Sequence, residues 1–153
     1  MNYSVIVLAA GRGSRTNLDY NKVFYTFENG QTVLNKSLSV FLSDDECKQV
    51  VLVCADYEKD YVNEHYTYDS RIQVVTGGKT RQDSVYNGLQ VVDQDYVMIH
   101  DGARPFVEKN WISDLKQTLE TESACLLMVP SVDTTKIVVD GYVKESLERK
   151  LIY

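Results

Sequence analysis

Cysteine, proline, glycine and long apolar runs are all scarce in this sequence. It has three cysteines, two prolines and eight glycines in 153 residues. The cysteines form no Cys-x-x-Cys pair, which argues against a zinc site or a disulfide framework. Glycine and proline are too few for a fibrous or low-complexity chain. The longest apolar runs, residues 5–10 and 124–130, are too short to cross a membrane, so we expect no membrane partner.

Basic residues are also in deficit. The chain has 16 Lys and Arg against 22 Asp and Glu, a net charge of −6. This argues against a broad surface for nucleic acid but leaves room for a small phosphate ligand, which needs only local positive charge. The first ten residues have no basic segment or cleavage site typical of a secretion signal. Cys54 and Cys125 stand in apolar runs, where a free thiol is usually buried. Reduced thiols and the lack of a secretion signal together predict a cytoplasmic protein.

The rest of the composition is that of an ordinary globular domain, with 44% hydrophobic and 25% charged residues. Continuous apolar runs alternate with segments of helical periodicity. The pattern predicts strands over residues 4–8, 49–55, 71–75, 95–99 and 124–129, and helices over 33–42, 57–66, 82–92 and 110–122.

Strands that are apolar on both faces and alternate with helices indicate an α/β fold. We expect a Rossmann-like, mostly parallel sheet with helices on both faces and right-handed crossovers. After Pro130 the pattern changes: Lys136–Val139 and residues 142–145 flank Asp140-Gly141, which is a hairpin turn signal. The sequence therefore predicts an α/β domain over residues 1–132 and a β-hairpin arm over 133–153.

Ligands of open α/β sheets bind beyond the carboxyl ends of the strands, and the first strand is followed there by a glycine-rich loop. Small residues let the backbone approach an anion, and basic side chains accompany them. Thr16 stands where a dinucleotide fingerprint would need its third glycine, and no Walker loop is present. An ordinary βα turn with solvated charges is the alternative. The candidate residues of this loop are Ala9, Ala10, Gly11, Arg12, Gly13, Arg15 and Lys22.

A second candidate segment, residues 77–84, leads from the third strand into a helix. Gly77-Gly78 followed by Lys79 and Arg81 at a helix N-terminus suits an anion. The alternative is an ordinary helix start, with Thr80 as the N-cap and Asp83 completing a capping box. Ser84 has the same two interpretations, a ligand contact or a hydrogen bond to the first turn of the helix.

Asp101 and Arg104 follow the fourth strand. A carboxylate at a strand end can hold Mg²⁺, directly or through water, and Arg104 can neutralise a phosphate. The alternative is a structural Asp–Arg pair that stiffens the turn. We expect His100 to be structural and His65 to lie on the surface.

A fourth junction, residues 131–136, offers hydroxyls for a polyol, or is a solvated loop. Positive charge is concentrated at these junctions, which hold six of the 16 basic residues, so they favour a polyanionic ligand. The six are Arg12, Arg15, Lys22, Lys79, Arg81 and Arg104.

Taken together, the four motifs resemble the cytidylyltransferases of the IspD/TarI type. The motifs are Leu-Ala-Ala-Gly-x-Gly-x-Arg with a later Lys, Gly-Gly-x-x-Arg-x-x-Ser-Val-x-x-Gly-Leu, His-Asp-Gly-Ala-Arg-Pro and Asp-Thr-x-Lys. They occur in order, and the resemblance runs from Ser4 to the last residue. It implies transfer of CMP from CTP to 2-C-methyl-D-erythritol 4-phosphate with release of pyrophosphate, on the non-mevalonate isoprenoid pathway. Ribitol 5-phosphate is the alternative acceptor.

The resemblance also implies roles for individual residues. Arg15 and Lys22 would be catalytic and would stabilise charge at the α-phosphate. The arm would swap across a homodimer and bring Arg149 from a neighbouring subunit, and Mg²⁺ would accompany CTP, with Asp101 on the metal side. The implied nucleotide-binding residues are Ala9, Ala10, Gly11, Arg12, Gly13, Gly77, Gly78, Arg81, Ser84 and Asp101, and the implied substrate-binding residues are Gly102, Arg104, Thr134, Thr135 and Arg149.

The sequence departs from the family pattern at its end. Relatives continue past the segment of Tyr153 with a Thr-Pro-Gln motif and a later lysine that reaches the α-phosphate. The resemblance therefore predicts that these residues are the N-terminal portion of the enzyme. Two alternatives belong to other functional classes. One is a CTP-binding module without catalysis. The other is a dinucleotide-dependent oxidoreductase, and Thr16 in place of the third fingerprint glycine argues against it.

Overall fold

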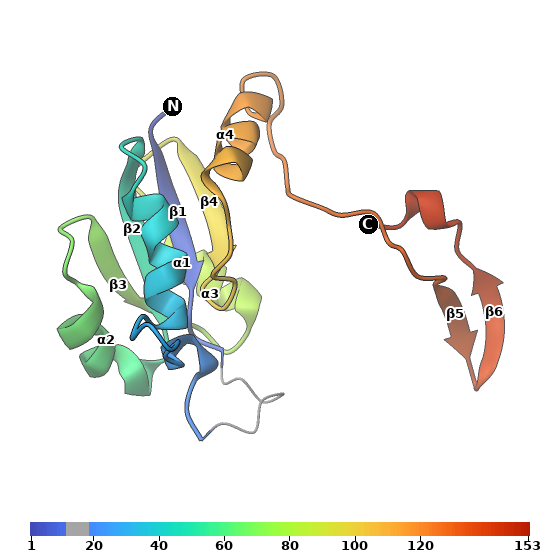
Figure 1. The fold of residues 1–153 in the computed structure, drawn as a ribbon, viewed down its shortest axis with the longest axis horizontal. Coiled ribbons are helices and arrows are strands. Elements are labelled where there is room, and N and C mark those ends of the chain that lie inside the picture. The colour runs from blue at the N-terminus through green and yellow to red at the C-terminus, as the bar shows by residue number, and fades with distance from the viewer. Residues whose placement is uncertain (12–18) are drawn as a thin grey trace. The chain divides into compact units, whose positions relative to one another are not determined.

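The computed structural model describes residues 1–11 and 19–153 (Figure 1). Contacts divide the chain into two compact units, Met1–Lys109 and Asn110–Tyr153. The predicted division at residue 132 stays a prediction, and each unit is described by itself. No helix of the described residues is long and apolar enough to span a membrane.

The first unit is built on a four-stranded parallel sheet. Its strands are β1 (Tyr3–Leu8), β2 (Cys47–Cys54), β3 (Ile72–Thr76) and β4 (Tyr96–Asp101), in the order β3-β2-β1-β4. All four are predicted strands, shifted by at most two residues at their ends. Leu8 is in register with Val53 and with Asp101, so the carboxyl ends of β1, β2 and β4 lie at one edge.

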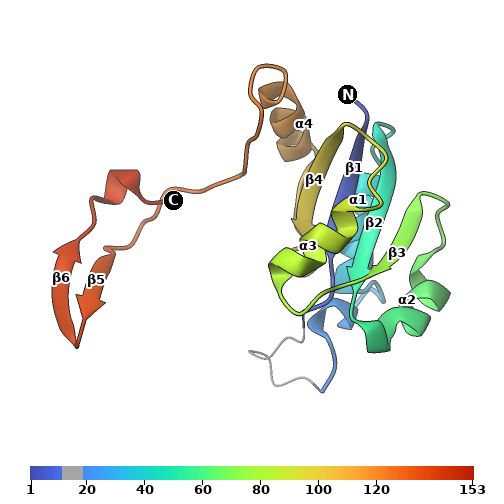
Figure 2. The same ribbon diagram turned by 180° about the vertical axis from the view of Figure 1, so that it is seen from behind.

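Helices cover both faces of this sheet, as predicted. The α-helices are α1 (Val33–Leu42), α2 (Lys59–Tyr66) and α3 (Arg81–Leu89), with 3₁₀ turns η1 (Lys22–Phe24) and η2 (Asp56–Glu58). In Figure 1 α1 lies in front of the sheet, and Figure 2, seen from behind, has α3 in front. The helix expected from residue 57 begins with η2, and α3 ends three residues earlier than expected.

The core lies where α1 and α3 pack against β1 and β2. Residues Val50 through Val53 are fully buried, as expected for a central strand that is apolar on both faces. On α3, a Cβ at Gly88 would stand 2.9 Å from the Ile6 side chain, so glycine permits close helix–sheet packing. Cys47 and Cys54 are buried free thiols, and burial raises the pKa of each to about 11.

A prediction concerns Asp69, which leads into β3. Arg71 donates from Nε to Asp69 Oδ1 at 3.0 Å and from Nη2 to Oδ2 at 2.9 Å, and these bonds lower the pKa of Asp69 to about 2. A lowered folded-state pKa stabilises the fold above the unfolded-state pKa of about 4, and this contribution is lost as the pH falls toward 2. Asp69→Asn should therefore be less stable than wild type at pH 7, with a difference that shrinks in acid. Urea denaturation of the two proteins at pH 7 and in acid measures the free energy of unfolding. An equal difference between them under both conditions would contradict the prediction.

The second unit holds the hairpin. Helix α4 (Lys109–Thr118) begins at the unit boundary and ends four residues earlier than expected. Strands β5 (Lys136–Val139) and β6 (Tyr142–Ser146) pair antiparallel, and a 3₁₀ turn η3 (Arg149–Leu151) follows. Asp140 and Gly141 have φ of 51° and 81°, which is the left-handed pair that the Asp-Gly signal predicts. The hairpin prediction is confirmed.

The predicted strand over residues 124–129 is wrong. This segment has no regular secondary structure, and Leu126 and Val129 are 70% and 77% exposed. A strand needs a neighbour for its backbone groups, and none of the described strands pairs with this segment. Cys125 is consequently only partly buried, which corrects the expectation that its thiol is buried.

Candidate functional site

The segments that follow β1, β3 and β4 are held at one edge of the sheet by backbone hydrogen bonds. Ala9 N donates to Val53 O at 2.7 Å, Gly77 N to Cys54 O at 2.8 Å, and Gly102 N to Leu8 O at 2.8 Å. The chain adds β2 and β3 on one side of β1, then returns to add β4 on the other. The carboxyl ends of β1 and β4 therefore form the topological switch point, where open α/β sheets bind ligands.

The turn after β3 requires its glycines. A Cβ at Gly77 would stand 2.7 Å from Ala10 Cβ, and one at Gly78 would overlap Asp83. Ala10 and Gly77 thus bring the ends of β1 and β3 into contact. This leaves the N-terminus of α3 close to Ala10, where the glycine-rich loop begins.

Ser84 stabilises this turn through two hydrogen bonds. Its hydroxyl accepts a hydrogen bond from Gly78 N at 3.0 Å and donates to Thr80 O at 3.0 Å, and the residue is only 5% exposed. Thr80 and Asp83 form the capping box considered above. Of the two interpretations of Ser84, the structure displays the structural one, and its contact with a ligand stays a prediction.

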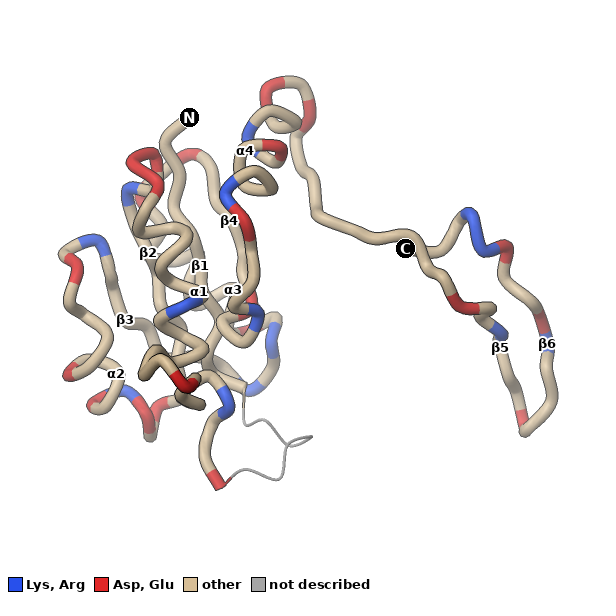
Figure 3. Tube along the Cα trace, viewed as in Figure 1, with Lys and Arg blue, Asp and Glu red and all other residues tan. Residues whose placement is uncertain are grey.

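Asp101, the last residue of β4, lies between two guanidinium groups. Arg81 Nη2 stands 3.0 Å from Asp101 Oδ1, and Arg104 Nε stands 3.0 Å from Oδ2. Both arginine side chains remain largely exposed, at 65% and 76%. In Figure 3 basic segments gather near the start of α3, beside the ends of β1 and β4. The sequence placed Arg81 on one motif and Asp101 and Arg104 on another, and the structure joins all three into one cluster of net positive charge.

Gly102 is buried, and the protein uses both of its backbone polar groups. Its N–H donates to Leu8 O, and its carbonyl accepts from the Ser37 hydroxyl of α1 at 2.7 Å. A Cβ here would stand 3.0 Å from Leu8 O, so close approach of two backbones accounts for this glycine. A direct substrate contact by Gly102 stays a prediction.

Both histidines are placed as expected. His100 is buried, its Nε2 hydrogen-bonds with Arg104 O at 3.1 Å, and burial lowers the pKa of the ring. It therefore shapes the turn that carries Arg104. His65 is exposed on α2 and stacks on Tyr61.

The residues described here do not form a magnesium site by themselves. Both oxygens of Asp101 are paired with arginines: Oδ1 accepts a hydrogen bond from Arg81, and Oδ2 forms an ion pair with Arg104. Within residues 1–11 and 19–153, no group of three or more His, Cys, Asp or Glu could hold a metal ion. Coordination of Mg²⁺ by Asp101, directly or through water, stays a prediction.

Lys22 begins η1 and is half-buried, close to the end of β1. The preceding residue, Asn21, donates from Nδ2 to Ala9 O at 2.6 Å and to Glu58 Oε2 at 3.2 Å. Sequence reasoning missed both Asn21 and Glu58, although an Asn before a helical turn is a recognisable N-cap signal. Arg12, Gly13 and Arg15 lie outside the described residues.

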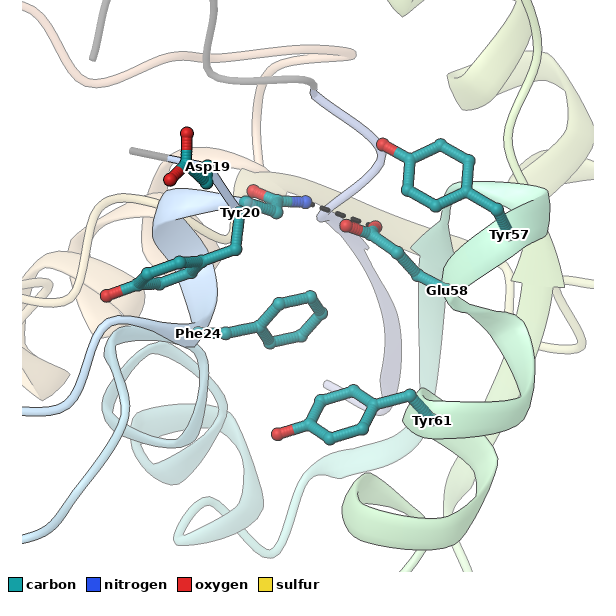
Figure 4. A pocket seen from close by; sticks show the side chains of 7 residues that line it. Asp19, Tyr20, Phe24, Tyr57, Glu58 and Tyr61 are labelled. Atoms are coloured by element: carbon teal, nitrogen blue, oxygen red, sulfur yellow. Dashed lines mark hydrogen bonds between the residues drawn. The ribbon is translucent and has the colours of Figure 1, made fainter. Parts of the chain in front are cut away.

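A pocket of about 530 Å³ opens beside this contact (Figure 4). Figure 4 shows the rings of Phe24 and Tyr61 on one side of the pocket and the carboxylate of Glu58 on another. This carboxylate accepts the hydrogen bond from Asn21. The full lining is Asp19, Tyr20, Asn21, Phe24, Tyr57, Glu58 and Tyr61.

The remaining candidate residues lie in the second unit. Arg149 Nη2 donates to Thr134 Oγ1 at 3.3 Å, and Leu147 N donates to Thr135 O at 3.0 Å. The base of the hairpin arm thus brings Thr134, Thr135 and Arg149 together. Ser131 N, which donates to Ile152 O at 2.8 Å, closes the same base.

The family model described as "IspD: 2-C-methyl-D-erythritol 4-phosphate cytidylyltransferase" matches residues 3–153. The chain belongs to this family. Curated IspD relatives named 2-C-methyl-D-erythritol 4-phosphate cytidylyltransferase include one from Clostridioides difficile, 40% identical over 99% of this chain and 65% of its own length. Another, from Bacillus mycoides, is 38% identical over 96% of this chain and 66% of its own length. The chain thus spans about two thirds of the length of these IspD proteins.

Solved IspD structures confirm the fold class. The 4-diphosphocytidyl-2C-methyl-D-erythritol synthase of Anaerococcus prevotii matches with a TM-score of 0.83 and 29% identity, over 99% of this chain and 66% of that chain. The 2-C-methyl-D-erythritol 4-phosphate cytidylyltransferase (IspD) of Francisella tularensis matches with a TM-score of 0.79 and 32% identity, over 99% and 68%. The expected family and the expected α/β nucleotidyltransferase fold are therefore both confirmed.

Proposed function

We propose that the protein carrying this chain is a cytidylyltransferase that transfers CMP from CTP to 2-C-methyl-D-erythritol 4-phosphate and releases pyrophosphate. Family membership supports the reaction. The observation that carries the site is the Arg81–Asp101–Arg104 cluster, which stands at the switch-point edge of the sheet. Two exposed guanidinium groups beside a glycine turn and a helix N-terminus suit a substrate that presents several phosphates.

The chemistry brings two anions together. A phosphate oxygen of the acceptor attacks the α-phosphorus of CTP in line, a new P–O bond forms, and the bond to the β-phosphate breaks to release pyrophosphate. Such a reaction asks the protein mainly to position the reactants and to stabilise negative charge. Lys22 and Arg15 are proposed to stabilise charge at the α-phosphate, while the backbone of Ala9, Ala10, Gly11, Arg12 and Gly13 cradles the triphosphate.

The remaining roles divide between the two units. In the first unit, the segment of Gly77, Gly78, Arg81 and Ser84 is proposed to hold the cytidine, Asp101 its ribose side, and Gly102 and Arg104 the acceptor phosphate. In the second unit, Thr134, Thr135 and Arg149 are proposed to hold the acceptor across a homodimer formed by the hairpin arms. The hydrogen bond from Arg149 to Thr134, and the bond from Leu147 N that fixes Thr135 O beside it, support a shared role. A cytoplasmic location and a requirement for Mg²⁺ stay predictions.

The proposal is tested by pyrophosphate release from the full-length protein. We expect turnover that depends on CTP and on 2-C-methyl-D-erythritol 4-phosphate. Ribitol 5-phosphate in place of that acceptor distinguishes the alternative substrate. CTP binding in a calorimeter without product would indicate a non-catalytic nucleotide-binding module, and no binding at millimolar CTP would overturn both hypotheses.

Asp101 gives a prediction at this site. Asp101→Asn should change the free energy of unfolding by less than about 1 kcal/mol, because ion pairs between exposed side chains contribute little. Turnover should nevertheless fall, since the carboxylate orients both arginines and is proposed to face the nucleotide. Urea denaturation and pyrophosphate release measure the two effects. If turnover fell only in proportion to the loss of folded protein, Asp101 would have a purely structural role.

A further inference from the structure

Asn21 connects three parts of the first unit that are distant in sequence. The residue is only 5% exposed. Its Nδ2 group donates to Ala9 O, directly beyond β1, and to Glu58 Oε2, on η2. Its Oδ1 accepts from Val23 N at 3.4 Å, which caps η1. One buried amide thus joins the end of β1, the start of η1 and the turn after β2.

These contacts close the base of the glycine-rich loop. Ala9 and Asn21 flank the eleven residues that carry Gly11 and Arg15, and their hydrogen bond of 2.6 Å fixes the separation of the two ends. Lys22 directly follows the closing residue. Its backbone position is set by Asn21 and by η1, whose 3₁₀ bonds run from Phe24 N to Asn21 O and from Tyr25 N to Lys22 O.

Glu58 is the less expected member of this contact. It is 9% exposed, and its own backbone N–H is fixed to Ala55 O at 3.0 Å. Burial raises the pKa of its carboxyl, whereas the hydrogen bond from Asn21 lowers it. A carboxylate with so little access to water requires such a donor. Glu58 therefore holds the Asn21 amide in the orientation that reaches Ala9 O.

We propose that Asn21 and Glu58 are positioning residues, which set where Lys22 and the chain directly after β1 stand relative to the triphosphate of the nucleotide. The inference rests on the proposed function. Neither side chain needs to touch the substrate: they act through Ala9 and Lys22, which flank the loop. Phe24 and Tyr61, whose rings meet edge to face with centroids 5.1 Å apart, brace η1 against α2 from the pocket side (Figure 4).

The test compares variants of the full-length protein in the pyrophosphate assay. Asn21→Asp puts a carboxylate against Ala9 O and Glu58, and should lower kcat by about 10- to 100-fold, the effect of a displacement of about 1 Å at a reacting centre. Asn21→Ala should lower it less, because it removes the bonds without adding repulsion. Glu58→Gln keeps an oxygen acceptor for the Asn21 amide and should retain nearly wild-type kcat.

A double variant separates the two bonds of Asn21. Asn21→Asp combined with Glu58→Gln exchanges donor and acceptor, so the amide introduced at position 58 would donate to the carboxylate introduced at position 21, while the bond to Ala9 O stays lost. The double variant should recover part of the kcat that Asn21→Asp alone loses. Asn63→Asp, the same charge change on the exposed surface of α2, is the matched control and should match wild type.

Hydrogen exchange gives a readout that does not depend on activity. In Asn21→Ala the amides of Val23 and Phe24 should exchange about tenfold faster, while the amides of β2 stay unchanged. Variants that fold with wild-type kcat and wild-type exchange would overturn the positioning role. If wild type shows no CTP-dependent turnover, the proposed function fails, and the exchange data still decide whether Asn21 holds η1 in place.

Discussion

Lys22→Ala is expected to lower kcat about 100- to 1,000-fold while KM for CTP changes by only a few fold. A cation that meets charge developing at the α-phosphate stabilises the transition state more than the bound substrate, so its loss appears in kcat. The structure places Lys22 at the start of η1, directly after Asn21, which is hydrogen-bonded to the end of β1. Steady-state kinetics of pyrophosphate release with varied CTP measures both constants, and Arg15→Ala should behave alike.

Lys48→Ala is the matched control for this experiment. Lys48 is exposed near the amino end of β2, the opposite end of the sheet from the candidate site, and its Nζ donates to Asp45 O at 2.7 Å. The substitution Lys48→Ala removes the same charge and should leave kcat and KM for CTP unchanged. If Lys22→Ala changed KM alone, Lys22 would contribute to ground-state binding of CTP and not to the transition state.

Gly78→Ala is expected to lower the free energy of unfolding by about 1–3 kcal/mol and to abolish nucleotide binding. The added Cβ would overlap Asp83 and stand 3.1 Å from its carbonyl carbon, so the turn or the start of α3 has to move. Such a movement displaces Arg81 and breaks the bond from Gly78 N to the Ser84 hydroxyl. Urea denaturation and calorimetry with CTP measure the two effects.

Gly11→Ala makes the same substitution in open space. No atom in the described part of the chain lies within 4 Å of the added Cβ. Stability should therefore match wild type, while CTP should bind more weakly because the methyl group enters the space proposed for the triphosphate. If both variants lost stability equally, the close packing of Gly78 on Asp83 would not be the cause.

Most of the fold could be predicted because its signals are local. Buried strands such as β2 are continuous apolar runs, α1 has the expected helical spacing from Val33 to Leu42, and Asp140-Gly141 marks its own turn. The segment over residues 124–129 is equally apolar, but an apolar run does not specify a partner. Without a neighbouring strand among the described residues, it leaves Leu126 and Val129 exposed.

In the candidate site, too, single residues could be predicted from local signals, whereas contacts between distant residues could not. The motifs located Asp101, Arg81 and Arg104, since each ends, opens or closely follows a regular element. The pairing of Arg81 with Asp101 joins residues 20 apart, and the Asn21–Glu58 bond joins residues 37 apart. Local spacing carries no information on such contacts, and the choice of Ser84 between the turn and a ligand depended on them as well.

The Arg81–Asp101–Arg104 cluster makes anion binding an exchange of partners. Before any ligand arrives, Asp101 already supplies one negative charge to two guanidinium groups. A phosphate that pairs with both arginines replaces carboxylate bonds that were already made, so the affinity reflects only the difference between the two sets of bonds. The cluster also needs fewer counterions than two free arginines, so that phosphate binding here should depend less steeply on salt.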